Sequence, residues 1–459
     1  MPPSDNRQLI LNIFTMNSVG HLSAGSWRHP RDESRRYTDL AYWTRLARTL
    51  ERGLIDAVFI ADVLGVYDVY QGSRDPAVRG GLQLPVNDPL QLVPAMAAVT
   101  EHLGFGVTAS VSFEHPYPFA RRMSTLDHLT GGRVGWNVVT SYLNSGALNL
   151  GVSAQVAQDR RYDIADEYLE VCYKLWERSW DDDAVRADAA AGVYADPLKV
   201  RAIGHAGEFF KVPGIHLSEP SPQRTPVIYQ AGASPRGQRF AARHAESIFT
   251  AAPTKAVLGR QVAALRSAIA DAGRDPRAVS ILNQHTVVVA ESDAQAQERF
   301  EEYRSYGSAE GALALLSGWM GIDLSALGDD EPLAEQPSDA IVTTVKAFSS
   351  ADPTRRWTVR DLADYALIGG DGPVSVGSPQ TVADQVEAWA AETGIDGLNL
   401  AAAVVPETFE QVVDLLVPEL QRRGRFKRSY AEGTLRHKLS GRGPRIAKDH
   451  AAAQVAIPD

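Results

Sequence analysis

Cysteine is almost absent from this sequence, and so are long apolar runs. The only cysteine among 459 residues is Cys172, so the chain can form no intrachain disulfide, and we expect a reducing compartment. No apolar run is long enough to cross a bilayer, and the polar first residues do not resemble a secretion signal. These absences predict a soluble, cytoplasmic protein without a membrane partner. Cys172 lies in the apolar periodic run 168–176, which favours a buried side chain over a nucleophile.

Positive charge is also scarce. Lysine and arginine total 46 against 56 aspartate and glutamate residues, which gives a net charge of −10. A nucleic-acid partner requires a basic face, so we expect none. The stretch 422–448 is locally basic, but no basic face with interleaved aromatic residues occurs elsewhere. We interpret this stretch as solvated or in contact with another subunit.

Common cofactor and catalytic motifs are missing as well. No Gly-x-Gly-x-x-Gly follows the first β-rich run and no Gly-x-x-x-x-Gly-Lys-Ser/Thr occurs, which argues against a dinucleotide fold and a P-loop. The 11 histidines include no His-Glu-x-x-His pair, and with one cysteine we expect no metal site. No Gly-x-Ser-x-Gly elbow is found either.

Short β-rich runs that alternate with helical patterns are what the sequence does contain. They occupy residues 9–14, 54–60, 103–111, 133–139, 225–230, 247–250, 279–289 and 397–402. This alternation predicts a parallel sheet buried on both faces, and eight runs favour an α/β fold of the TIM (β/α)₈ barrel type. The alternative is a doubly wound open sheet.

Two long insertions interrupt this pattern. Residues 181–222 come after the fourth strand and residues 305–373 after the seventh, within a single domain that we assign to 1–439, with 440–459 as a tail. Loops at the carboxyl ends of barrel strands build the active site, so both insertions are candidate lids. Packing or subunit contact is the alternative for each.

Polar residues close three consecutive strands. Asp62 follows the second strand, Thr108 lies in the third, and Asn137 interrupts the fourth. All three would meet at the mouth of the barrel, where they can hold the edge of a heteroaromatic cofactor. Taken singly, Asp62 is also a helix cap and Thr108 an ordinary strand residue.

Two loops complete the candidate chemistry. The small residues of 230–237 follow the fifth strand and enter a helix, so their free N–H groups suit a cofactor phosphate, or they form a plain turn capped by Ser234. His21 lies on a Gly/Ser loop after the first strand. It faces a substrate or is an ordinary hydrogen-bonding surface group.

Several of these residues belong to longer motifs that resemble a known family. Residues 125–134, Thr-Leu-Asp-His-Leu-Thr-Gly-Gly-Arg-Val, and 136–141, Trp-Asn-Val-Val-Thr-Ser, are similar to segments of the bacterial-luciferase-like flavin monooxygenases. Further matching stretches are 12–14, 21–29, 50–53, 99–104, 161–168, 226–237 and 396–400. The resemblance is to the branch of the nitrilotriacetate, dibenzothiophene-sulfone and dimethylsulfide monooxygenases, and residues 61–73 look most like the dimethylsulfide type.

The resemblance implies the oxygenase half of a two-component system. A separate NAD(P)H-dependent flavin reductase would supply FMN as FMNH₂, and O₂ would add to the flavin at C4a or N5. The resulting flavin (hydro)peroxide would oxidise and cleave a small organosulfur or C–N compound. Homodimers or homotetramers are typical of such proteins.

The resemblance also implies roles for individual residues. Asp62, Thr108 and Asn137 would approach the isoalloxazine and ribityl chain, and Gln158, Tyr162, Ala233 and Ser234 would hold the phosphate. Glutamine at position 158 departs from the histidine that relatives often carry there. Phe14 and His21 would line the pocket beside the flavin.

One departure concerns the substrate side. Sulfone-cleaving relatives carry a proposed catalytic histidine in the segment that matches residues 316–321, where this chain has Trp319. We therefore expect a more aromatic and apolar pocket, with His21 and Trp319 as the candidate catalytic and substrate-binding residues. Plain packing of a lid is the alternative for Trp319.

Other functions remain open from the sequence. An oxidative lyase or dehalogenase would act on a heteroaromatic or chlorinated aromatic such as riboflavin. A barrel that binds flavin without catalysis would show no substrate-dependent turnover, and a relative that uses F420 would differ in the spectrum of its cofactor.

Overall fold

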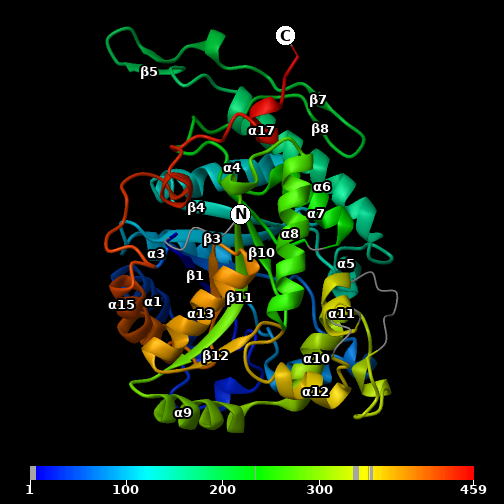
Figure 1. Cartoon of the computed structure of the whole chain (residues 1–459). Helices are drawn as coiled ribbons and strands as arrows, with labels where there is room; N and C mark the ends of the chain where they lie inside the picture. The colour runs from blue at the N-terminus through cyan, green and yellow to red at the C-terminus, as the bar shows by residue number, and fades with distance from the viewer. Residues whose placement is uncertain (1–6, 233, 334–340, 350, 352–354, 459) are drawn as a thin grey trace.

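The computed structural model describes residues 7–458 apart from 233, 334–340, 350 and 352–354, and the side chains of 342 and 343. Its centre is a closed barrel of eight parallel strands (Figure 1). They are β1 (Ile10–Met16), β2 (Ala57–Ala61), β3 (Gly104–Ser110), β4 (Val134–Val139), β9 (Val227–Gln230), β10 (Ser247–Thr250), β11 (Ser280–Val289) and β13 (Gly397–Ala401). The barrel closes where β10 pairs with β11 and β13 pairs with β1. The eight predicted strands and the TIM-barrel class are confirmed, and the open-sheet alternative is excluded.

A ninth strand of the central sheet was not predicted from the sequence. The short β12 (Val374–Gly377) adds to the carboxyl half of β11, where Thr286 lies opposite Val374. Its Val-Ser-Val-Gly sequence is too short and too close to Gly and Pro residues to be distinguished from a loop.

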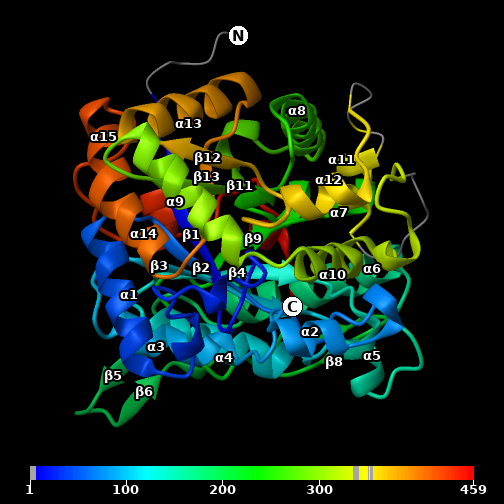
Figure 2. The same ribbon diagram turned by 90° about the horizontal axis from the view of Figure 1, so that it is seen from below.

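Helices surround the barrel on all sides (Figure 2). Outward-facing strand residues such as Leu11, Ile13 and Val58 are fully buried against them. The surrounding helices include α1 (Leu40–Arg52), α3 (Leu92–Ala97), α4 (Pro116–Leu129), α6 (Gln158–Tyr173), α7 (Pro235–His244), α8 (Lys255–Asp271), α9 (Asp293–Tyr306), α13 (Pro379–Thr393), α14 (Glu407–Gln411) and α15 (Val417–Arg422). Cys172 is fully buried on α6, as predicted, and burial raises the pKa of its thiol. Within the described ranges, no helix is long and apolar enough to cross a membrane.

Aromatic rings fill the interior of the barrel toward the amino ends of its strands. Phe59, Tyr229 and Phe249 pack together, and the rings of Tyr229 and Phe249 stack with centroids 5.4 Å apart. Gly135 is required beside them, because a Cβ there would lie 2.4 Å from the Tyr229 ring. Leu435, on α16 (Leu435–Ser440), joins this cluster from the amino end of the barrel, where a Cβ at Gly104, the first residue of β3, would lie 2.5 Å from it. Since the amino end of the barrel is filled, the space for a ligand lies at the carboxyl end.

The two insertions lie at opposite ends of the molecule in Figure 1. Residues 181–222 follow α6 rather than β4 directly, and they contain the hairpins of β5 (Val185–Asp188) with β6 (Val193–Ala195) and of β7 (His205–Ala206) with β8 (Lys211–Val212). Residues 305–373 contain α10 (Ala309–Met320), α11 (Val342–Ser349) and α12 (Val359–Tyr365). Only the second insertion borders the cavities described below.

The basic stretch 422–448 is solvated only in part: Arg422, Arg442 and Arg445 are exposed, but Arg436 is buried against the barrel, and a contact with another subunit stays a prediction. Arg436 is only 3% exposed, its Nε lies 2.6 Å from Glu246, and its Nη2 donates to the carbonyl of Thr225 at 2.8 Å. Further along, His450 Nε2 lies 2.6 Å from the carbonyl oxygen of His244 on α7. The buried Arg436 guanidinium thus compensates carbonyl groups and a carboxylate of the chain's own barrel, and the neutral His450 fixes the following residues against α7.

Candidate functional site

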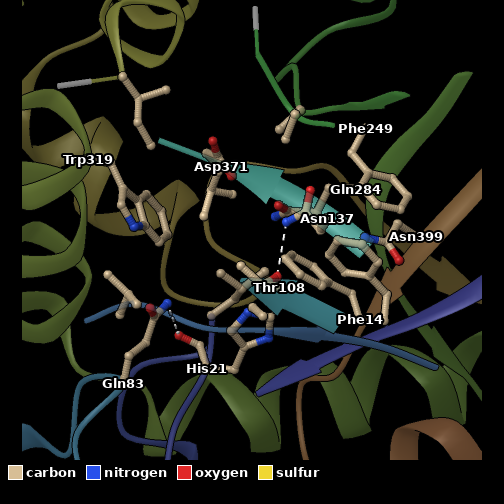
Figure 3. Close-up of a pocket in the computed structure, with 18 of the residues that line it drawn as sticks. Phe14, His21, Gln83, Thr108, Asn137, Phe249, Gln284, Trp319, Asp371 and Asn399 are labelled. Atoms are coloured by element: carbon tan, nitrogen blue, oxygen red, sulfur yellow. Dashed lines mark hydrogen bonds between the residues drawn. The ribbon is translucent and has the colours of Figure 1, made fainter. Parts of the chain in front are cut away.

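Two adjoining cavities open at the carboxyl ends of the strands. The first encloses about 1030 Å³ including its mouth and is lined mainly by apolar and aromatic side chains (Figure 3). The second encloses about 900 Å³ and lies over the beginnings of α6 and α7. Residues common to both walls include Asp62, Val139, Tyr142 and Ala231. The two cavities therefore form one continuous cleft across the mouth of the barrel.

Thr108 and Asn137 lie side by side on the wall of the first cavity. They are register partners on β3 and β4, and Asn137 Nδ2 donates to Thr108 Oγ1 at 3.0 Å. The Asn137 Oδ1 atom is buried and has no hydrogen-bond partner within the part of the chain that the structure describes. A buried carbonyl oxygen of this kind is costly unless a ligand donates to it.

Asp62 lines both cavities. It follows β2 directly, and because the next helical element, Tyr70–Gly72, begins eight residues later, it does not cap a helix. That alternative is therefore wrong. Burial, followed by the nearby charge of Asp88, raises the pKa of the Asp62 carboxyl to about 7. A carboxyl group whose pKa lies near 7 is present in both its charged and its neutral form at physiological pH. It can therefore exchange a proton or donate a hydrogen bond.

Gln158, Tyr162 and Ser234 meet in the second cavity. Gln158 begins α6, and Ser234 caps α7, where its Oγ accepts a hydrogen bond from the N–H of Gly237 at 3.1 Å. The turn that the sequence offered as an alternative is thus present, and it borders the cavity as well. Two helix N-termini that point at one space favour an anion there. Ala233, predicted beside Ser234, lies outside the described residues.

The loop before Ser234 approaches Tyr162 closely. A Cβ at Gly232 would lie 2.6 Å from the Tyr162 hydroxyl, so only glycine fits there. Burial is the main cause that raises the pKa of Tyr162, which stays a neutral hydrogen-bond donor. The sequence reasoning did not select Arg161, which is 3% exposed, lines the second cavity and donates to the carbonyl of Val156 at 2.8 Å. Its signals in the sequence are its position beside Tyr162 at the start of a helix and its place in the matching stretch 161–168.

Phe14 and His21 lie together on the wall of the first cavity. Their rings meet edge to face with centroids 4.4 Å apart. Burial lowers the pKa of His21 to about 3, although its hydrogen bond to Phe14 opposes this shift. The imidazole is therefore neutral at physiological pH, so it can orient a ligand but cannot act as a cationic acid.

Trp319 reaches the first cavity from α10 of the second insertion. Its Nε1 donates to the Tyr67 hydroxyl at 3.0 Å, and that hydroxyl lies 2.8 Å from Gln83 Oε1 and 2.7 Å from the Tyr142 hydroxyl. Trp319 is thus packed against Tyr67 and also lines the cavity, and its role toward a substrate stays a prediction. Tyr67, Gln83 and Tyr142 were not predicted, since they lie on loops with no local pattern that marks a site.

Comparison with known proteins identifies the family of this barrel. Residues 13–397 match the model of the luciferase-like monooxygenases. The chain belongs to this family. It is accordingly an enzyme, a flavin-dependent oxidoreductase, and the resemblance in its motifs is confirmed.

Individual luciferase-like relatives are similar over nearly their whole length. The dimethyl-sulfide monooxygenase of Hyphomicrobium sulfonivorans is 52% identical over 98% of this chain and 94% of its own, and the structure of that organism's DmoA superposes with a TM-score of 0.91. The long-chain alkane monooxygenase of Geobacillus thermodenitrificans is 47% identical over 98% of both chains. A riboflavin lyase solved with modified FMN and riboflavin is 35% identical, covers 98% of this chain and 100% of its own, and has a TM-score of 0.92.

Proposed function

We propose that this chain is the oxygenase component of a two-component FMN monooxygenase. It would receive FMNH₂ from a separate NAD(P)H-dependent flavin reductase and use O₂ to oxidise and cleave a small organosulfur or C–N compound. The observation that carries this proposal is the continuous cleft, which is aromatic at one end and bordered by helix N-termini at the other.

The polarity of the cleft, which is aromatic at one end and bordered by helix N-termini at the other, supports FMN as its ligand. In the proposal, Asp62, Thr108 and Asn137 hold the isoalloxazine and the ribityl chain, and the unpartnered Asn137 Oδ1 accepts from the bound group. Gln158, Tyr162, Ala233 and Ser234 surround the phosphate, and we add Arg161 to this set because a buried guanidinium offsets phosphate charge. Reduced FMN, when bound, would supply the electrons that activate dioxygen.

The remaining walls position the substrate. Phe14 and Trp319 would pack against its apolar part, and the neutral His21 would orient a polar atom by a hydrogen bond. The chain of hydrogen bonds through Tyr67 fixes the Trp319 ring, which keeps the pocket shape and excludes water from the reacting groups.

The relatives support a range of substrates. A dimethyl-sulfide monooxygenase at 52% identity favours a small organosulfur compound. The similarity to a riboflavin lyase, with a TM-score of 0.92, favours oxidative cleavage of a heteroaromatic as the second candidate. A barrel that binds flavin without catalysis is the third outcome that the experiment below must separate.

The test is oxygen consumption with FMN, NADH and a generic flavin reductase, together with product analysis by mass spectrometry. Thioethers, alkylamines and riboflavin are offered in turn. We expect one class to yield an oxygenated or cleaved product whose amount tracks oxygen use. Turnover at the rate of the reductase alone, for every compound, would contradict the proposal. We also propose a homodimer or homotetramer, which sedimentation equilibrium measures.

A further inference from the structure

Asp371 is a carboxyl that neither the motifs nor the proposed flavin contacts explain. It lies between α12 and β12, at the end of the second insertion, and lines the first cavity. Figure 3 shows it on the cavity wall beside Trp319. A Cβ at the preceding Gly370 would lie 3.2 Å from the Trp319 ring, which places this turn against the indole.

Asp371 has no cationic partner among the described residues. Among the residues that the structure describes, its side-chain hydrogen bond is with Gln284, whose Nε2 also donates to the carbonyl of Gly369 at 2.8 Å. Some deeply placed carboxylates in this protein are paired with arginine, as Glu246 is with Arg436 and Asp396 with Arg266, whereas Asp127 is compensated by hydrogen bonds from Gln223. A carboxylate held away from bulk water without a counter-ion is costly, and burial raises the pKa of Asp371 to about 6.

The whole first cavity is biased against anions. The described residues that line it include two carboxyl groups, Asp62 and Asp371, and no lysine or arginine. Its one histidine, His21, is neutral at physiological pH. A cation that enters this space would meet only negative or neutral groups, and an anion would be repelled.

The aromatic side chains of Tyr67, Tyr142 and Trp319 line the same cavity as the Asp371 carboxyl group. Burial is the main cause that raises the pKa values of Tyr67 and Tyr142, and the charge of Asp371 adds a smaller contribution to both, so both phenols lie within its electrostatic reach. With Trp319 they form an aromatic wall, and aromatic faces attract alkylammonium groups. A carboxylate beside such a wall can accept the N–H bonds of a protonated amine while the rings contact its methylene groups.

We propose that Asp371 and this aromatic wall form a subsite for a cationic nitrogen group, so that the substrate is a small organic compound with a protonated aliphatic amine. The inference deepens the proposed function and rests on it: the amine would anchor one end of the substrate and direct the oxidisable sulfur or carbon toward the flavin side of the cleft. Asp371 determines specificity in this account and takes no part in the oxygen chemistry.

The test compares three thioethers of similar size: 2-(methylthio)ethylamine, which is cationic, methyl propyl sulfide, which is neutral, and the carboxylate (methylthio)acetate, CH₃–S–CH₂–COO⁻, which is anionic. Their binding is measured by isothermal titration calorimetry at neutral pH, on the flavin-free protein and with oxidised FMN present, so that no turnover occurs. We expect the amine to bind about 10 to 100 times more tightly than the neutral thioether, the factor of a charged hydrogen bond, and the acid to bind most weakly.

The Asp371→Asn variant should lose most of this preference and bind the neutral thioether as the wild type does. Asp364→Asn is the matched control, because this carboxylate lies on α12 of the same insertion and its side chain is 69% exposed. Wild-type protein that binds the amine no more tightly than the neutral thioether would overturn the inference, as would an unchanged preference in Asp371→Asn.

The calorimetric result is independent of the proposed function. Amine preference without oxygen consumption or FMN binding would refute the monooxygenase proposal and leave the subsite standing. Oxidation of the neutral thioether at full rate, with no amine preference in binding, would refute the subsite alone.

Discussion

Replacing Asp62 with asparagine should stabilise the flavin-free protein at alkaline pH. Burial and the charge of Asp88 raise the pKa of Asp62 from 3.8 to about 7. Between these two values the folded protein holds a proton that the unfolded chain has released, so the stability of the wild type falls as the pH rises through this window. The loss is complete above the folded pKa. Asparagine cannot ionise and avoids it.

The size of the effect follows from the shift. Each pKa unit corresponds to about 1.4 kcal/mol, so a shift of about three units sets an upper limit of about 4 kcal/mol. Asp62 faces a cleft open to solvent, and we reduce this to about 1–2 kcal/mol. Urea unfolding of the flavin-free protein at pH values of about 5 and 8 measures how the difference between variant and wild type changes across the titration window.

We expect Asp62→Asn to gain stability over the wild type as the pH rises. Asp364→Asn, on the exposed surface of α12, is the control and should show no such gain. A difference that does not change with pH, or a variant less stable than the wild type at the higher pH, would refute this account of the Asp62 environment.

The remaining predictions concern the second cavity and the aromatic wall. Ser234→Phe fills the space at the start of α7 and should weaken FMN binding at least about tenfold in a fluorescence titration, and wild-type affinity would show that the site is misplaced. Arg161→Met should weaken binding of FMN about tenfold but leave riboflavin, which lacks the phosphate, unaffected; equal losses for both would argue against a phosphate contact. Gly318→Ala places a Cβ 2.2 Å from the Tyr67 ring. It should therefore cost about 1–3 kcal/mol in thermal unfolding and disturb the Trp319 contact, and a neutral effect would contradict the packing.

The barrel could be predicted because its signals are local. Most core strands are short, largely apolar runs, which is the pattern of a parallel strand buried on both faces; β11 is longer and has the polar residues 283–286 in its middle. Thr108 and Asn137 could be paired for the same reason, since the carboxyl ends of neighbouring strands meet at one mouth. Asp62 could be predicted as a residue of the barrel mouth because it directly follows an apolar run.

The substrate side could not be predicted in the same way. Tyr67, Gln83, Tyr142 and Asp371 come from loops and from the second insertion, and no periodic pattern says where such segments cross the barrel mouth. The basic residue Arg436 looked solvated because its partners, Glu246 and strand-end carbonyls, are about two hundred positions away in sequence. When the hydrogen-bond and ion-pair partners of a buried charged residue are distant in sequence, the residues around it do not show that it is buried.

The central claim is tested most directly by a crystal structure of the protein with FMN bound. The account predicts the isoalloxazine in the first cavity beside Asp62, Thr108 and Asn137, and the phosphate in the second cavity among Gln158, Tyr162 and Ser234. Flavin density with the phosphate in the first cavity, or outside the cleft, would contradict it.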